Sequence, residues 1–490
     1  MSSADQPTGS SSETQATHLN PKVIVISVAA AVGGFLFGFD TSVINGAVDA
    51  LSADFELGAG LTGFAVSSAL IGCAVGAWFA GSLANRYGRI TVMVVAASLF
   101  FVSALGSGFA VGVVDLIIWR MIGGLGVGAA SVIAPAYIAE VAPARFRGRL
   151  GSLQQLAIVL GIFVALLSNA LLAGVAGGAA ETLWFGVSAW RWMFVIEAIP
   201  AAVYGVMALF LPESPRFLVG KGERDKASKV LYDFTGELDV NLKIQQIQHS
   251  LEREKKESFR DLLGGSFGLK PIVWIGILLS LFQQLVGINV IFYYSTTLWR
   301  SVGFEESQAL LTSTITSVIN ILATILAIIL VDRVGRRIML LVGSAGMTVS
   351  LGVMALAFSF AHATDGAESV TLEQPWSIIA LIGANSFVIF FGTTWGPLVW
   401  VLLGEIFPNR IRASALAVAA AAQWAANWAV STTFPMLSNI GLTFAYGLYA
   451  AFALVSFLFV FLRVPETKDR ELEDMDDLKL GRERSGSSST

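Results

Sequence analysis

Two glutamines, an asparagine and two tyrosines fall in one short apolar stretch, QQLVGINVIFYYS, from Gln283 to Ser295. A buried polar group without a partner costs several kcal/mol in hydrocarbon, so these side chains need partners. An amide has two donor hydrogens and an acceptor oxygen, and a sugar hydroxyl both donates and accepts. Uncharged amides can therefore bind a neutral polyol without burying a charge, whereas an amino acid or a phosphate favours fixed charges. The alternative, bonding to neighbouring helices, stays open.

A second group of reactive residues is a charged pair placed inside apolar segments. Asp40 lies in the first segment and Arg120 in the fourth. The first segment runs outward and the fourth inward, so both residues are expected roughly 8–9 Å below the outer edge of the membrane at 1.5 Å per residue, and we predict that they meet. Arg120 favours the ionised form of Asp40, while burial favours the neutral acid. We interpret the pair as a proton switch; a purely structural salt bridge is the alternative.

The elements that must position these residues are membrane helices. The chain of 490 residues is 55% hydrophobic and 13% charged, with a mean hydropathy of +0.71. A soluble protein carries about a quarter charged residues. A span needs about 20 apolar residues. Twelve candidate spans begin near residues 23, 61, 91, 115, 151, 190, 271, 308, 338, 376, 413 and 441.

The distribution of Lys and Arg predicts the orientation and the domains. Nearly all of the 31 fall in segments on one side of the predicted spans, which places both termini in the cytoplasm. The first residues are polar and lack the basic start and apolar core of a signal peptide. We expect a disordered tail (1–20), a six-helix bundle (21–212), a helical linker (213–270), a second six-helix bundle (271–464) and a cytoplasmic tail (465–490).

The two halves of the chain repeat three motifs in the same order. GSLANRYGRI (81–90) matches ILVDRVGRRI (329–338), EVAPARFR (140–147) matches EIFPNRIR (405–412), and PESPRFL (212–218) matches PETKDREL (465–472). The similar offsets indicate a parallel duplication of six spans. Such a duplication is typical of a transporter whose halves rock around a central site.

These motifs resemble the sugar porter family of the major facilitator superfamily, and together they cover about residues 23–475. Asn85, where many superfamily members carry Asp, and Ile90, in place of a second arginine, depart from the wider pattern. The resemblance implies an all-α membrane protein with the major facilitator fold, in which twelve transmembrane helices form two pseudo-symmetric six-helix bundles with short cytoplasmic helices between them.

The resemblance also implies roles for single residues. A tryptophan offers an apolar plane and one N–H, which suits a sugar ring, although a membrane tryptophan is often an interfacial anchor. The implied substrate-binding residues are Gln155, Gln283, Gln284, Asn289, Asn320, Trp400, Gln423 and Trp424, with Phe391 and Asn427 as secondary candidates. The implied cytoplasmic gate comprises Arg86, Arg89, Glu140, Arg147, Glu213, Arg333, Arg336, Arg337, Glu405, Arg412 and Glu466.

The resulting expectation is a proton-coupled symporter that imports a neutral sugar or polyol (a hexose, a pentose or myo-inositol) across the plasma membrane by alternating access. We expect a monomer in contact with membrane lipid, without cofactor, metal or nucleic acid. No nucleophile–base pair, metal cluster or phosphate loop stands out, which argues against an enzyme. An uncoupled sugar facilitator and a non-transporting sugar sensor are the alternatives.

Overall fold

The computed structural model describes residues 21–142, 147–235, 239–254, 259–264, 268–363, 370–408 and 411–466. The tail 1–20 and residues 467–490 of the second predicted tail lie outside the described residues. Within the described ranges, eleven segments are helical, long and apolar enough to cross a membrane. The predicted span near 413 is helix α18, Arg412–Ile440, which has 29 residues and so the length to cross, but a more polar composition that includes Gln423 and Asn427.

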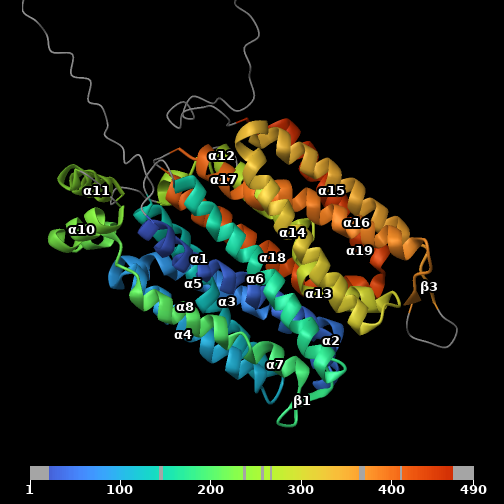
Figure 1. Ribbon diagram of the computed structural model, residues 1–490. Helices are drawn as coiled ribbons and strands as arrows, with labels where there is room; N and C mark the ends of the chain where they lie inside the picture. Colours follow the sequence, from blue (N-terminus) through green and yellow to red (C-terminus); the bar gives the residue numbers. More distant parts are fainter. Residues whose placement is uncertain are drawn as a thin grey trace, which may run out of the picture.

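The first half of the chain forms a bundle of long, roughly parallel helices, coloured blue to green in Figure 1. Its elements are α1 (Pro21–Val43), η1 (Ile44–Gly46), α2 (Val48–Asp54), α3 (Ala59–Tyr87), α4 (Arg89–Gly108), α5 (Val113–Val141), α6 (Arg147–Ala176), the hairpin β1 (Thr182–Trp184) and β2 (Val187–Ser188), α7 (Ala189–Val195) and α8 (Ala198–Phe210).

The second half forms the bundle coloured yellow to red. Its elements are α12 (Pro271–Leu285), α13 (Ile288–Ser301), α14 (Glu306–Val334), α15 (Arg336–Phe358), the hairpin β3 (His362–Ala363) and β4 (Val370–Thr371), α16 (Trp376–Phe390), η5 (Phe391–Trp395), α17 (Gly396–Ile406), α18 and α19 (Leu442–Arg463).

Short helices connect the bundles: α9 (Pro215–Gly220), α10 (Arg224–Val230), η3 (Leu231–Thr235), α11 (Val240–Glu254) and η4 (Phe259–Leu262). Their apolar residues, among them Leu218, Val230 and Ile244, form a small core of their own. The charged segment between the bundles is therefore largely helical. We call the end of the molecule that carries α10 and α11 the linker end, and the opposite end, which carries α2, the α2 end (Figure 1).

Glycines allow the closest helix contact in the first bundle. Gly72 and Gly76 on α3 face the backbone of α5, and Gly124 and Gly128 on α5 face the backbone of α3. A Cβ atom at any of these four positions would collide with a carbonyl oxygen of the other helix. Small residues at an interface let helix backbones pack closely in a membrane, where no hydrophobic effect drives association.

Three of the spans are broken rather than continuous. Gly287 adopts a left-handed conformation with φ +83° between α12 and α13, so the polar stretch from Gln283 to Ser295 belongs to two helices. A turn at Ile196 and Glu197 separates α7 from α8. The π-helical segment η5 separates α16 from α17. Interrupted spans free backbone groups and mark binding sites in transporters.

Candidate functional site

The amides of the broken seventh span form a chain of hydrogen bonds. Gln283 Nε2 donates to the carbonyl oxygens of Trp395 (2.9 Å) and Gly396 (3.0 Å), which lie at the break between η5 and α17. Gln284 Nε2 donates to Gln283 Oε1 at 3.5 Å, and Asn289 Nδ2 donates to Gln284 Oε1 at 2.5 Å. Gln283 and Gln284 are buried, but Asn289 is half-buried. This chain of hydrogen bonds therefore begins at the backbone carbonyl groups of Trp395 and Gly396. It ends at Asn289, the most exposed of the three amides.

Two other predicted contacts lie near this amide chain. Asn320 on α14 is buried and faces Gly392 of η5, where a Cβ atom would come within 3.0 Å of Asn320 Oδ1. Trp400 lies one helical turn beyond Gly396 on α17 and is 43% exposed. Gln283, Asn320 and the start of the helix that carries Trp400 therefore lie around η5.

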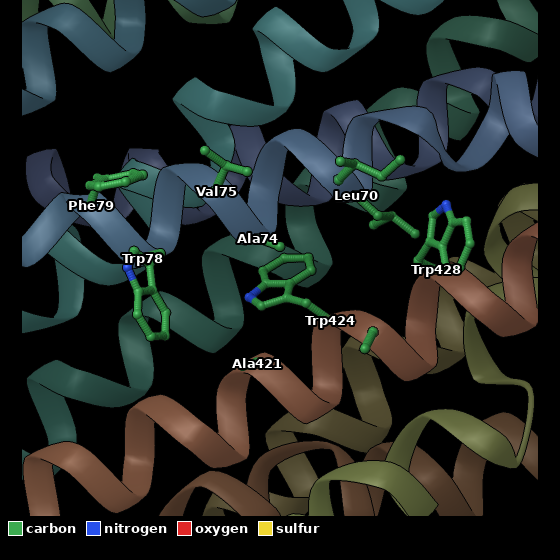
Figure 2. A pocket seen from close by; sticks show the side chains of 10 residues that line it. Leu70, Ala74, Val75, Trp78, Phe79, Ala421, Trp424 and Trp428 are labelled. Carbon is green, nitrogen blue, oxygen red and sulfur yellow. The ribbon is translucent and has the colours of Figure 1, made fainter. Parts of the chain in front are cut away.

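Trp424 of α18 lies where the two bundles meet. Its ring packs edge-on against Phe37 of α1, with 5.8 Å between ring centroids and 78° between planes. It also lines an apolar groove of about 520 Å³ between α3 and α18, where Figure 2 shows it between Trp78 and Trp428. Beside it, Gln423 Oε1 is buried without a hydrogen-bond partner.

The first-half amide Gln155 is half-buried on α6. Its neighbour Gln154 is the more unusual residue, because it is 8% exposed and neither polar atom of its amide has a hydrogen-bond partner. Gln154 packs against Gly34 of α1. Sequence reasoning preferred Gln155 and did not distinguish the environments of the two.

The predicted charged pair does meet. Arg120 Nη1 lies 2.6 Å from Asp40 Oδ1, and both side chains are almost completely buried. The pair joins the C-terminal part of α1 to the N-terminal part of α5.

A third ionisable group, which sequence reasoning missed, completes this centre. Glu197, at the break between α7 and α8, is 2% exposed and its side chain is within hydrogen-bonding reach of Asp40. Asp40 Oδ2 and Glu197 Oε1 are both buried, and neither has a donor among the residues that the structure describes. A carboxylate in the middle of the sixth predicted span was the signal available in the sequence. We call Asp40, Arg120 and Glu197 the ion centre.

At the linker end, the repeated motifs of the first bundle form one network. Arg89 binds both carboxylate oxygens of Glu140, at 3.0 and 2.8 Å. Ser214 also donates to Glu140. Glu213 accepts from the backbone N–H groups of Arg89 and Ile90 at the start of α4. A carboxylate there satisfies unpaired donors and complements the helix dipole.

The second bundle repeats this arrangement. Arg336 Nη2 binds Glu405 at 3.0 Å. Glu466 accepts from the backbone N–H groups of Arg336 and Arg337 at 2.9 and 3.1 Å, at the start of α15. These bonds, like those of Arg89, join elements of the same bundle. Arg86 is exposed over the ring of Tyr87 and Arg333 ends α14; the side chains of Arg147 and Arg412 lie outside the described part.

The network predicts the effect of one glycine substitution. Gly88 has φ +99°, and a Cβ atom there would collide with the Glu213 carboxylate. We expect Gly88→Ala to destabilise the protein by about 1–3 kcal/mol, because the backbone is strained and the carboxylate is displaced. The melting temperature in detergent would measure this loss. Gly81→Ala in α3, where a Cβ meets no atom within 4 Å, should leave the melting temperature unchanged.

The bundles are joined to each other at the α2 end. Asn45 Nδ2 donates to Phe292 O and Ser295 Oγ, both at 2.9 Å, and Asn45 Oδ1 accepts from the N–H and hydroxyl groups of Thr296. Asp49 accepts from Thr297 and Arg300, each at 2.7 Å. Sequence reasoning did not find these contacts, because each partner is an ordinary side chain or backbone group about 250 positions away.

Two further bonds cross between the bundles on this side of the molecule. Ala179 N donates to Glu306 Oε1 at 2.7 Å, and the hydroxyls of Ser67 and Thr432 lie 2.6 Å apart. A duplicated bundle with broken helices, a buried ion centre and cross-bundle contacts at one end is typical of membrane transporters built from repeats. The family model for sugar (and other) transporters matches residues 26–478. The chain belongs to the sugar porter family of the major facilitator superfamily.

Relatives and solved structures agree with this assignment. The sugar porter is 56% identical to a glucose transport protein from Synechocystis sp. over 95% of this chain and 99% of that protein. It is 39% identical to the D-xylose-proton symporter of Escherichia coli, covering 93% and 95% of the two chains. An inward-open structure of the E. coli xylose transporter XylE matches with a TM-score of 0.78, 37% identity and coverage of 93% and 99%. The chain is a multi-pass membrane transporter and not an enzyme.

Proposed function

We propose that this sugar porter couples the entry of a proton to the import of a neutral hexose or pentose across the plasma membrane. The observation that carries the proposal is the ion centre, in which two buried carboxylates face one guanidinium beside a bundle interface rich in uncharged amides. A relative named as a glucose transporter and one named as a xylose-proton symporter favour the same class of substrate.

The sugar would bind at the end of the amide chain. The hydrogen bonds of Gln283 and Gln284 fix their orientation, so these two residues act by positioning Asn289 and polarising its amide. Asn289 retains its carbonyl oxygen and one N–H for a hydroxyl of the substrate. Asn320 and Trp400 would supply a further amide and an apolar plane for the ring. Gln155, Gln423 and Trp424 would close the site from α6 and α18.

The proton would be held in the ion centre. Asp40 and Glu197 lie close together and have only the one positive charge of Arg120 beside them. Both carboxylates therefore cannot be ionised at once, and the pair holds one proton. Arg120 binds Asp40 directly, so Glu197 is the group that holds the proton in this conformation. Its protonated carboxyl supplies the donor that Asp40 Oδ2 otherwise lacks. Loss of that proton leaves two negative charges beside Arg120 and so changes how α1, α5 and α8 pack.

The two six-helix units, 21–212 and 271–464, would be the rocking bodies, with 213–270 as the linker. Since most Lys and Arg lie toward the linker end, that end would face the cytoplasm together with both termini. The bonds of Asn45 and Asp49 would then close the extracellular side, and the conformation described here would face inward. The linker-end networks stay within each bundle in this conformation, and their carboxylates would make the cytoplasmic gate when the other side opens.

Removing the extracellular bonds is expected to shift this equilibrium. Asn45→Ala would leave the Thr296 donors and the Phe292 carbonyl without the partner seen here, at a cost of about 1–3 kcal/mol for a buried group. The ratio of inward- to outward-facing molecules would therefore fall about 5- to 150-fold. Distances between spin labels across the α2 end would measure this shift. Asn385→Ala, which removes an amide bonded to Thr316 of the same bundle, is the control and should not change those distances.

Uptake by purified protein in vesicles tests the proposal. With a pH gradient, we expect labelled sugar to accumulate above its outside concentration, and an uncoupler to abolish this accumulation. Competition by unlabelled glucose, xylose, arabinose and myo-inositol would identify the substrate. Equilibration without accumulation would favour a facilitator, and saturable binding without uptake would favour a sensor.

A further inference from the structure

Tyr204 of α8 carries a buried hydroxyl that the mechanism above does not use. The side chain is 0% exposed, and within the described ranges its hydroxyl has no hydrogen-bond partner. It lies in an apolar cluster that includes Ala30 and Ala130. A buried hydroxyl without a partner destabilises a fold, and phenylalanine would fill the same space without that cost. Packing alone therefore does not account for a tyrosine here.

The Tyr204 hydroxyl lies on the linker-end side of the ion centre. Tyr204 follows Glu197 by seven residues, two turns along the same helix face and about 10 Å along its axis. Long side chains on a helix point back toward its N-terminus, which here is the side of Glu197. On the facing helix, a Cβ atom at Gly33 would lie 2.9 Å from the hydroxyl, and Gly33 precedes Asp40 by the same seven residues. The glycine leaves the space beside the hydroxyl free of a side chain.

Polar groups continue from Tyr204 toward the linker end. Tyr137 on α5 is fully buried, and its hydroxyl donates to the carbonyl oxygen of Pro212 at 2.6 Å, which leaves its oxygen lone pairs as acceptors. Glu140, one turn further along α5, belongs to the Arg89 network at the linker end. The hydroxyls of Tyr204 and Tyr137 therefore lie between the ion centre and the charged linker end of the first bundle.

We propose that Tyr204 is a relay residue that passes the coupled proton from Glu197 toward the linker end; this inference rests on the proposed symport. Glu197 releases its proton to a water molecule and becomes a carboxylate facing Arg120. The Tyr204 oxygen accepts a proton from the water on that side while its own proton leaves to a water on the Tyr137 side. The tyrosine ends neutral, and one proton has moved inward.

The surroundings of Tyr204 leave few other proton carriers. The titratable groups on the helices around Tyr204 are Asp40 on α1, Cys73 on α3, Arg120 and Tyr137 on α5, and Glu197 just before α8. The helix α4, which packs along α8, has no titratable side chain between Ile90 and Gly108. Asp40 is bound to Arg120, so the hydroxyls of Tyr204 and Tyr137 are the groups placed to carry the proton inward.

The test compares two transport modes of wild type and Tyr204→Phe in vesicles. Net uptake driven by a pH gradient requires proton release, whereas exchange with saturating sugar on both sides lets the loaded carrier shuttle with its proton in place. We expect net uptake of Tyr204→Phe to fall at least about tenfold, since a lost proton-transfer group costs that or more. Exchange should stay within about twofold of wild type, because the ring and its packing are kept.

Tyr446→Phe is the matched control, because Tyr446 also has a buried hydroxyl without a partner but lies on α19 in the other bundle. Both modes should be unchanged in it. Unchanged net uptake in Tyr204→Phe, or a parallel fall of exchange, would overturn the relay while leaving the proposed symport standing. A wild-type protein that exchanges sugar but never concentrates it would overturn both.

Discussion

Replacing Asp40 with asparagine is expected to abolish accumulation of sugar against its gradient while sugar exchange continues. One pH unit is worth about 1.4 kcal/mol, so with one proton per sugar it supports about tenfold accumulation in the wild type. Without Asp40, Arg120 loses its 2.6 Å partner and is left to pair with Glu197. Glu197 would then stay ionised beside the guanidinium through the whole cycle. No group would exchange a proton, and inside and outside concentrations would become equal.

Two companion variants locate the proton. Glu197→Gln keeps the shape of the protonated acid and supplies an N–H donor to Asp40 Oδ2, so it should also lose accumulation but retain exchange. Asp115→Asn makes the same change of charge as Asp40→Asn near the start of α5, where the carboxylate only accepts a bond from Val111 N. It should accumulate sugar like the wild type. Tenfold accumulation by Asp40→Asn would show that the ion centre is a structural salt bridge.

The sequence predicted the architecture well because it is repeated and governed by hydropathy. Long apolar segments and motifs that recur about 250 residues apart identified the spans, the two halves and the family. The pairing of Asp40 with Arg120 followed from their depth, since a helix rises by a constant length per residue. The breaks within the spans were harder to predict. Gly287 could be suspected because glycine weakens a helix, but no residue near Ile196 indicates a turn there.

What the sequence did not predict depends on tertiary contacts. Glu197 was hidden because one carboxylate in an apolar span is informative only when its neighbours are known. The bonds of Asn45 to α13 depend on how the two bundles pack in the conformation described here, and residue types alone do not specify that packing. Glu213 and Glu466 were expected as gate charges, but in this conformation they bind the backbone N–H groups that open α4 and α15.

The different roles of the three amides also could not be predicted, because the sequence gives no reason to treat Gln283, Gln284 and Asn289 as other than equal sugar ligands. In the structure, Gln283 is held by two carbonyl oxygens, and both Gln283 Oε1 and Gln284 Oε1 accept from the next amide in the chain. Substitutions at Gln283 therefore disturb the break at Gly396 as well as the site. Asn289, at the accessible end, is the residue whose loss reports on the sugar itself.

Asn289→Ala is accordingly expected to raise the KM for the transported sugar by about 10- to 100-fold, the loss that follows when a buried hydroxyl loses its partner. The maximal rate should change little if the amide binds the sugar equally in all states. Asn385→Ala, which removes an amide bonded to Thr316 and Leu381 between α14 and α16, is the control and should leave KM unchanged. Uptake measured over a range of sugar concentrations separates the two parameters. An unchanged KM in Asn289→Ala would mean that the chain of amides only stabilises the broken helix, and that the sugar binds elsewhere between the bundles.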